Sequence, residues 1–315
     1  MRKFLVLVAV LAAMVAACGG QAAVTNDPYE LVHRAQSATW ERVQVDVGIN
    51  VSGPETISID PSAMRFAIDT TAGKANIHVA FPIAALGDAA SEIRALGITG
   101  DTLDIDVIFD GEALYAKSAA LGNVFAALMV QAGEIPSGDM TGWLQLLSKA
   151  DLESLGSLGG GLSPVPVPDD LPIPSGADVG TIKTSLEEMG ITLTYVGTGS
   201  RNGVDADHVS VAVDLAKLAE SEFVKGMDSG DLDLDPSDGT LSGDLWFERS
   251  NGRLIGVDIH AASTTDTTEK ADITINLHDP DAGVSFDAPA SFVEVPLMEL
   301  ISSFMGGLGG GLLPQ

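Results

Sequence analysis

Apolar and polar residues alternate with a period of two along much of this chain. In the clearest case Val43, Val45, Val47 and Ile49 are separated by polar or small residues. This pattern predicts a strand with one face buried and the other face exposed to solvent. Turn residues separate further short segments of the same kind. We therefore expect strands at residues 43–51, 57–59, 64–68, 77–81, 103–109, 114–117, 191–195, 209–213, 241–247, 254–259, 273–277 and 284–286.

Tight turns join several of these predicted strands. Asp110-Gly111, Asn202-Gly203 and Asn251-Gly252 each lie between two alternating segments, and such dipeptides favour two-residue hairpins. Strands joined so closely pair antiparallel, because parallel neighbours need long crossovers.

Segments with a helical pattern lie between these predicted strands. Asp27 and Pro28 form an N-cap and a first helical residue, and they open the folded part of the chain. Further helices are expected at residues 84–96, 121–131, 140–155, 175–189 and 214–225. The combination predicts an α+β fold, in which a large curved antiparallel sheet covers helices on its inner, concave side.

Glycine and proline interrupt the pattern twice. Residues 155–176 contain Gly159-Gly160-Gly161 and five prolines, which is typical of a linker or a long surface loop. Residues 296–315 read as a short apolar segment followed by a flexible glycine-rich tail. The periodicity leaves open whether the two halves share one sheet. We favour a single domain over residues 27–295, because each half alone has few strands.

The N-terminus has the composition of a secretory signal. Arg2 and Lys3 precede an apolar run that ends in Val15-Ala16-Ala17-Cys18, and the run is shorter than the roughly 20 residues that span a bilayer. These four residues resemble a bacterial lipobox. The resemblance implies a signal peptide at residues 1–17, a lipid attached to Cys18, and a tether at residues 18–26. Cys18 is the only cysteine, so no disulfide competes for its thiol.

The charge of the chain restricts its partners. The formal net charge is -28, and such a surface repels nucleic acids and anionic lipid headgroups. We therefore expect no nucleic-acid partner, and attachment to the extracytoplasmic face of the cell membrane through the lipid on Cys18 alone.

No local motif indicates catalysis or a cofactor. The five histidines lack the close spacing of a metal motif, so ordinary surface or strand histidines are favoured over ligands. Asp231, Asp233 and Asp235 alternate as in a calcium loop, but Pro236 replaces its glycine. We expect neither an enzyme nor a metal site.

The order of elements resembles a known family. The entry Trp40-Glu41-Arg42-Val43, the hairpin around Asn251-Gly252 and the closing Asp287-Ala288-Pro289 are similar to the LppX/LprG group of actinobacterial lipoproteins and the wider LolA-like carriers. The resemblance implies a half-open barrel with an apolar cavity for lipids or lipoproteins in transit. A lipid or glycolipid ligand and an envelope transporter or acceptor protein would then be its partners.

Two functions remain open from the sequence. In one, the inward apolar residues line a cavity between sheet and helices that holds a lipid or another long apolar ligand, for transport or display. In the other, the same residues are a packed core and the chain is a tethered structural or protein-interaction domain. The candidate lining residues are Phe66, Ile68, Val107, Phe109, Leu193, Val211 and Phe247.

Overall fold

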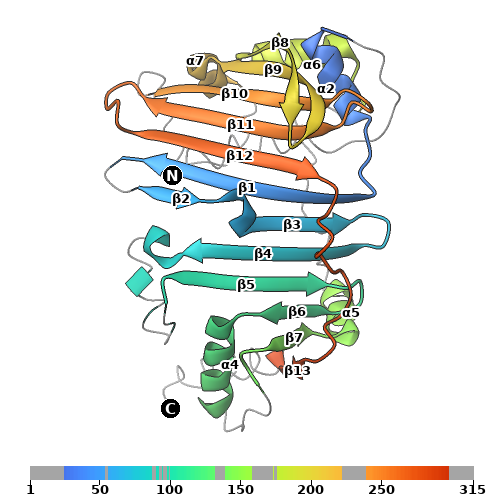
Figure 1. Ribbon diagram of the computed structural model, residues 1–315, viewed down its shortest axis with the longest axis vertical. Coiled ribbons are helices and arrows are strands. Elements are labelled where there is room, and N and C mark those ends of the chain that lie inside the picture. The colour runs from blue at the N-terminus through green and yellow to red at the C-terminus, as the bar shows by residue number, and fades with distance from the viewer. Residues whose placement is uncertain are drawn as a thin grey trace, which may run out of the picture. The chain divides into compact units, whose positions relative to one another are not determined.

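The computed structural model divides into two compact units. Figure 1 labels their helices and strands. The first unit comprises residues 1–41, 45–62 and 166–279, and the second unit comprises residues 42–44, 63–165 and 280–315. Each unit is described by itself below. The structure describes residues 25–297 except for 54–55, 87–89, 92–93, 95–97, 99, 132–138, 158–172, 174–175 and 222–238.

The fold class is α+β with a large open antiparallel sheet, as the sequence predicts. In the first unit the hydrogen-bonded strand order is β1-β12-β11-β10-β9-β8, and β2 pairs with β1. Its strands are β1 (Arg42–Ser52), β2 (Ile57–Ile59), β8 (Ile191–Arg201), β9 (Val204–Val213), β10 (Gly239–Glu248), β11 (Leu254–Ser263) and β12 (Lys270–His278). The first three residues of β1 belong to the second unit.

The predicted hairpin at Asn202-Gly203 joins β8 to β9. Asn202 has φ 52° and Gly203 has φ 78°, and a type I′ turn requires positive φ at both positions. Leu193 then faces Val211, and Ile191 faces Val213 across the pair. The turn sets the register as far as Gly197, and an irregularity between Tyr195 and Gly197 then shifts the register by one residue.

Three helices of the first unit begin after an aspartate. They are α2 (Pro28–Gln36), α6 (Val179–Glu188) and α7 (Leu215–Glu220). Asp27 accepts from the Tyr29 amide, and Asp178 and Asp214 accept in the same way at the other two. Such caps satisfy amides that the helix leaves unpaired. Asp178 explains why α6 begins later than the predicted residue 175.

The apolar face of the first unit is packed. Tyr29, Leu31 and Val32 of α2 and Ile182 and Leu186 of α6 are all buried in the same core. The strands contribute Ile191, Leu193, Val209, Val211, Leu245, Phe247, Leu254, Val257, Ile259 and Ile273 to that core. The two helices therefore cover this face of the sheet.

In the second unit the strand order is β13-β7-β6-β5-β4-β3. Only the pair β13–β7 is parallel among these described strands. The elements are β3 (Met64–Asp69), β4 (Lys74–Pro82), β5 (Thr102–Phe109), β6 (Leu114–Lys117), α4 (Ala119–Gln131), β7 (Trp143–Leu147), α5 (Lys149–Ser157) and β13 (Val293–Glu294). Short 3-10 helices cover Pro61–Ala63 and Ile83–Leu86.

The predicted helix at residues 140–155 is wrong in its first half. The segment forms β7 and then α5, because Leu144 and Leu146 pack against α4 while Trp143 packs on the opposite side with Tyr115. Helix α5 begins at a capping box, in which the Asp151 amide donates to Ser148 Oγ and the Ser148 amide donates to Asp151 Oδ2.

The predicted strand at residues 284–286 is also wrong. Asp281 and Gln44 exchange hydrogen bonds, and Asn76 donates to the Ser285 carbonyl. The Val284 amide donates to the Asp281 carbonyl, so a local turn and side-chain hydrogen bonds take the place of a strand ladder in this segment.

Most of the predicted helix at residues 84–96 and the end of the one at 214–225 lie outside the described residues. In the part of the chain that the structure describes, no helix has the length and apolarity needed to cross a membrane.

Candidate functional site

The apolar face of strands β3, β4 and β5 is the candidate site. Directly opposite residues in neighbouring strands project from the same face of a sheet. Phe66 faces Ile77, which in turn faces Val107. Ile68 and Phe109 both face Ala75. The strand register therefore brings together four of the predicted lining residues, Phe66, Ile68, Val107 and Phe109, on one face.

This face stays half-buried across all three strands. Its apolar residues are Met64, Phe66, Ile68, Ile77, Val79, Phe81, Leu103, Ile105, Val107 and Phe109, and each is intermediate in exposure. The surface continues toward Leu144, which is fully buried beside Met129 of α4. Helix α4 thus covers one end of the face, and the apolar side chains over β3–β5 stay partly exposed.

The other three predicted lining residues lie elsewhere. Leu193 and Val211 are each 5% exposed and Phe247 is 1% exposed. All three belong to the core of the first unit beneath α2 and α6. The predicted lining residues therefore form two groups, one packed in the core of the first unit and one half-buried on the sheet of the second unit.

The opposite face of β4 and β6 contacts the C-terminal segment. The Lys74 ammonium lies 2.9 Å from a carboxylate oxygen of Asp287. The rings of Tyr115 and Phe292 lie 5.1 Å apart between centroids. Ile108 and Tyr115 are each 5% exposed on this side. The apolar side chains Ile108 and Tyr115 on this side are buried, whereas the apolar side chains of the candidate face are partly exposed.

Four of the five histidines contact an aspartate. The pairs are His78 with Asp106 at 2.8 Å, His208 with Asp244 at 2.6 Å, His260 with Asp272 at 2.7 Å and His278 with Asp46 at 2.9 Å. His33 instead contacts the carbonyl of Ala177. The hydrogen bond to Asp272 raises the pKa of His260 above its usual value. Sequence spacing gave no sign of these pairs, because each joins residues on different strands.

Two of the groups named from the sequence lie outside the described residues. They are Cys18 and the aspartates 231, 233 and 235. Cys18 as the lipid attachment site therefore stays a prediction.

Of three comparisons with known proteins, the one with solved structures gave matches. A scan against protein-family models found no match, and neither did a search of curated proteins. Among solved structures, the lipoprotein LppX of Mycobacterium tuberculosis matches with a TM-score of 0.37 and 12% identity, over 82% of this chain and 97% of that chain. LprF of Mycobacterium bovis matches with a TM-score of 0.33 and 12% identity, over 86% and 100%.

A third match comes from outside the mycobacteria. A Vibrio parahaemolyticus domain described as lipoprotein-sorting matches with a TM-score of 0.19 and 8% identity, over 82% of this chain and 94% of that chain.

Proposed function

We propose that the protein is a membrane-anchored envelope lipoprotein that holds a lipid or another long apolar molecule on the face of β3, β4 and β5. The partial exposure of ten apolar side chains on that one face carries the proposal. Partly exposed apolar side chains that lie next to one another on one sheet face form a surface that an apolar ligand can cover. The equivalent surface of the first unit is packed under α2 and α6 and offers no such site among the described residues.

An acyl chain can bury many CH2 groups on this surface. Burying a CH2 group contributes about 0.8 kcal/mol, so covering about ten of them contributes about 8 kcal/mol before ordering costs are subtracted. Before those costs about 8 kcal/mol would correspond to a Kd of about 1 μM, so the affinity gained from ten CH2 groups alone is weaker than that. A long apolar ligand is therefore large enough to bind, whereas a small apolar molecule gains too little from a surface of this kind.

The N-terminal signal supports the location. With Cys18 acylated, the chain would stay at the extracytoplasmic face of the cell membrane, and the acidic surface would keep the folded part away from anionic headgroups. A carrier at this place would exchange lipid with an envelope transporter or acceptor protein. The proposed role is binding and transfer, without a chemical step.

Probe binding tests the proposed surface. A chain lacking residues 1–18 should bind a fluorescent fatty acid with saturation. Val107→Asp should weaken that binding at least tenfold, because it places a charge in the middle of the half-exposed face. Thr192→Asp, on the polar side of β8 in the first unit, is the matched control and should bind as the parent does. Equal binding by all three chains would contradict the proposed surface.

A further inference from the structure

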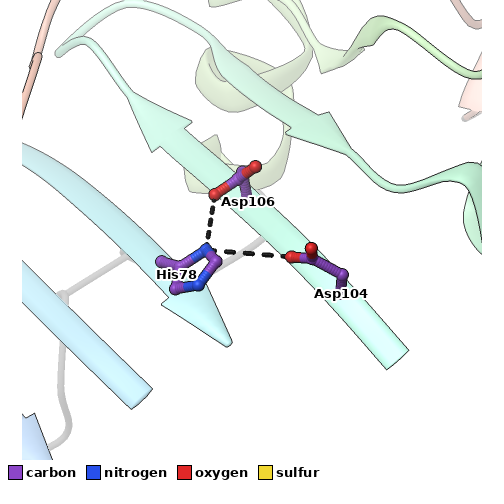
Figure 2. A group of neighbouring side chains, drawn as sticks. All are labelled: His78, Asp104 and Asp106. Carbon is purple, nitrogen blue, oxygen red and sulfur yellow. Dashed lines mark hydrogen bonds and ion pairs between the residues drawn. The ribbon is translucent and has the colours of Figure 1, made fainter. Parts of the chain in front are cut away.

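A group of three metal-ligating side chains lies on the other face of the same strands. His78 of β4 faces Asp106 of β5 directly, and Asp104 precedes Asp106 by two residues on the same face. Figure 2 shows both carboxylates directed at one edge of the imidazole ring. His78 Nδ1 lies 2.8 Å from Asp106 Oδ1 and 3.8 Å from Asp104 Oδ1. One ligand atom from each of the three residues lies within 4.8 Å of the others.

We propose that His78, Asp104 and Asp106 bind a first-row divalent metal ion of the zinc type. Bonds of about 2.0–2.2 Å from a metal to nitrogen and oxygen place neighbouring ligand atoms about 3.0–3.5 Å apart at tetrahedral or octahedral angles. The separations of 2.8 Å and 3.8 Å bracket that range. The two distances from Nδ1 thus fit a shared ion, and the ligand atoms of the two carboxylates lie within 4.8 Å of each other.

The donor set selects the class of ion. One imidazole nitrogen with two carboxylate oxygens suits zinc and its first-row neighbours, whereas calcium and magnesium prefer oxygen alone. His78 is 21% exposed, Asp106 35% and Asp104 67%. Solvent therefore reaches the open side of the site, where water can complete the coordination shell. Both strands are paired on each side, which holds the ligands on a rigid support.

His260 shows what distinguishes this arrangement from an ordinary histidine–aspartate pair. Its Nδ1 lies 2.7 Å from Asp272, and its Nε2 lies 3.5 Å from Asp244. The two carboxylates thus meet opposite nitrogens of the ring, and a single ion cannot bond to both carboxylates and to one of these nitrogens. At His78 both carboxylates face Nδ1. His260 is therefore a natural control within the same chain.

Two cations on the same face should modulate the affinity. Arg65 faces His78 in the strand register, and Lys117 faces Asp106. Among the ion pairs of the described residues, none joins either cation to Asp104 or Asp106. Their charge opposes a bound cation, so removing the exposed Lys117 charge should tighten metal binding. A merely structural histidine–aspartate pair would give no such response.

Calorimetry with Zn²⁺ alone tests the site. The full chain, purified without an affinity tag in detergent and with any free Cys18 thiol alkylated, should bind one equivalent that depends on His78. His78→Ala and Asp106→Asn should each weaken binding more than about tenfold, since loss of even an outer-shell partner typically costs that much. Lys117→Gln should bind more tightly than the parent, and His260→Gln should bind as the parent does. Far-UV circular dichroism of each variant should match the parent.

The opposite results would overturn the proposal. Zn²⁺ binding unchanged in His78→Ala, or lost equally in His78→Ala and His260→Gln, would assign the binding to dispersed acidic groups. Because the three ligands lie on the face opposite to the apolar one, their variants leave fatty-acid binding intact. Failure of the metal site is thus distinguishable from failure of the proposed lipid-binding function.

Discussion

Arg201 forms a two-pronged ion pair with Asp258 on the polar face of the first unit. Nη1 lies 2.9 Å from Asp258 Oδ2 and Nη2 lies 2.8 Å from Oδ1. Nε donates to Asn276, and the Trp246 indole donates to the same carboxylate at 3.1 Å. One guanidinium at the end of β8 thus connects β11 and β12, with the carboxylate also held from β10.

Removing this carboxylate should destabilise the first unit. The two side chains are 18% and 14% exposed, and loss of one partner from a fully buried pair typically costs 3–5 kcal/mol. We expect Asp258→Ala to lower the free energy of unfolding by about 2–3 kcal/mol, because the pair is only partly buried. Urea unfolding followed by tryptophan fluorescence measures it. Glu187→Gln, which removes an exposed pair with Lys183 in α6, should cost less than about 0.5 kcal/mol. Equal losses would mean that the Arg201 pair is an ordinary surface contact.

Phe247 and Phe66 should respond differently to truncation. Phe247 is 1% exposed in the packed core, so Phe247→Ala should lower the free energy of unfolding by about 3–5 kcal/mol. Phe66 is half-buried on the candidate face, so Phe66→Ala should cost clearly less stability and weaken fatty-acid binding instead. Urea unfolding and probe titration of both variants check this. A larger stability loss at Phe66 would indicate that its face is packed.

His260 should make stability depend on pH. Its pKa is raised in the folded chain by the hydrogen bond to Asp272, so the folded state binds the proton more tightly than the unfolded one. The resulting stability is fully present below the unfolded pKa of about 6.5 and is lost as pH rises through the higher folded value. His260→Gln should therefore destabilise the chain more at pH 5.5 than at pH 9. Thermal melts at both values measure the difference, and a larger effect at pH 9 would contradict the sign.

Cys18 should carry the anchor. We expect the mature chain to begin at Cys18 and to carry two or three acyl chains, since one acyl chain binds membranes only marginally. Intact mass spectrometry of membrane-extracted protein checks both features. Cys18→Ser should leave the signal uncleaved and the mass free of acyl groups. A wild-type chain with an unmodified thiol would rule out the anchor.

Local signals predicted much of the fold. Asp27-Pro28 marked the start of α2, and Asn202-Gly203 gave the β8–β9 hairpin, because caps and type I′ turns depend on the residues at those positions alone. Period-two alternation placed the other long strands. It failed at residues 143–147, where a short apolar strand next to a helix resembles one long helical segment.

The site depended on information that a local pattern lacks. Val107 and Val211 have the same alternating context, yet one is half-buried and the other is 5% exposed. The difference arises from which helices cover each face, and periodicity does not encode it. Likewise His78 meets Asp104 and Asp106 only through the β4–β5 register, so spacing along the chain gave no metal motif.

The most direct test of the central claim is whether the protein carries an apolar ligand. Native mass spectrometry would compare the chain lacking residues 1–18, expressed in a lipid-containing host, before and after delipidation with organic solvent. We expect the native sample to be heavier by the mass of one lipid-sized molecule, and the lipid to appear in the extract. Val107→Asp, which places a charge on the β3–β5 face, should lose most of that added mass. Identical masses before and after delipidation, together with no saturable fatty-acid binding, would contradict the account.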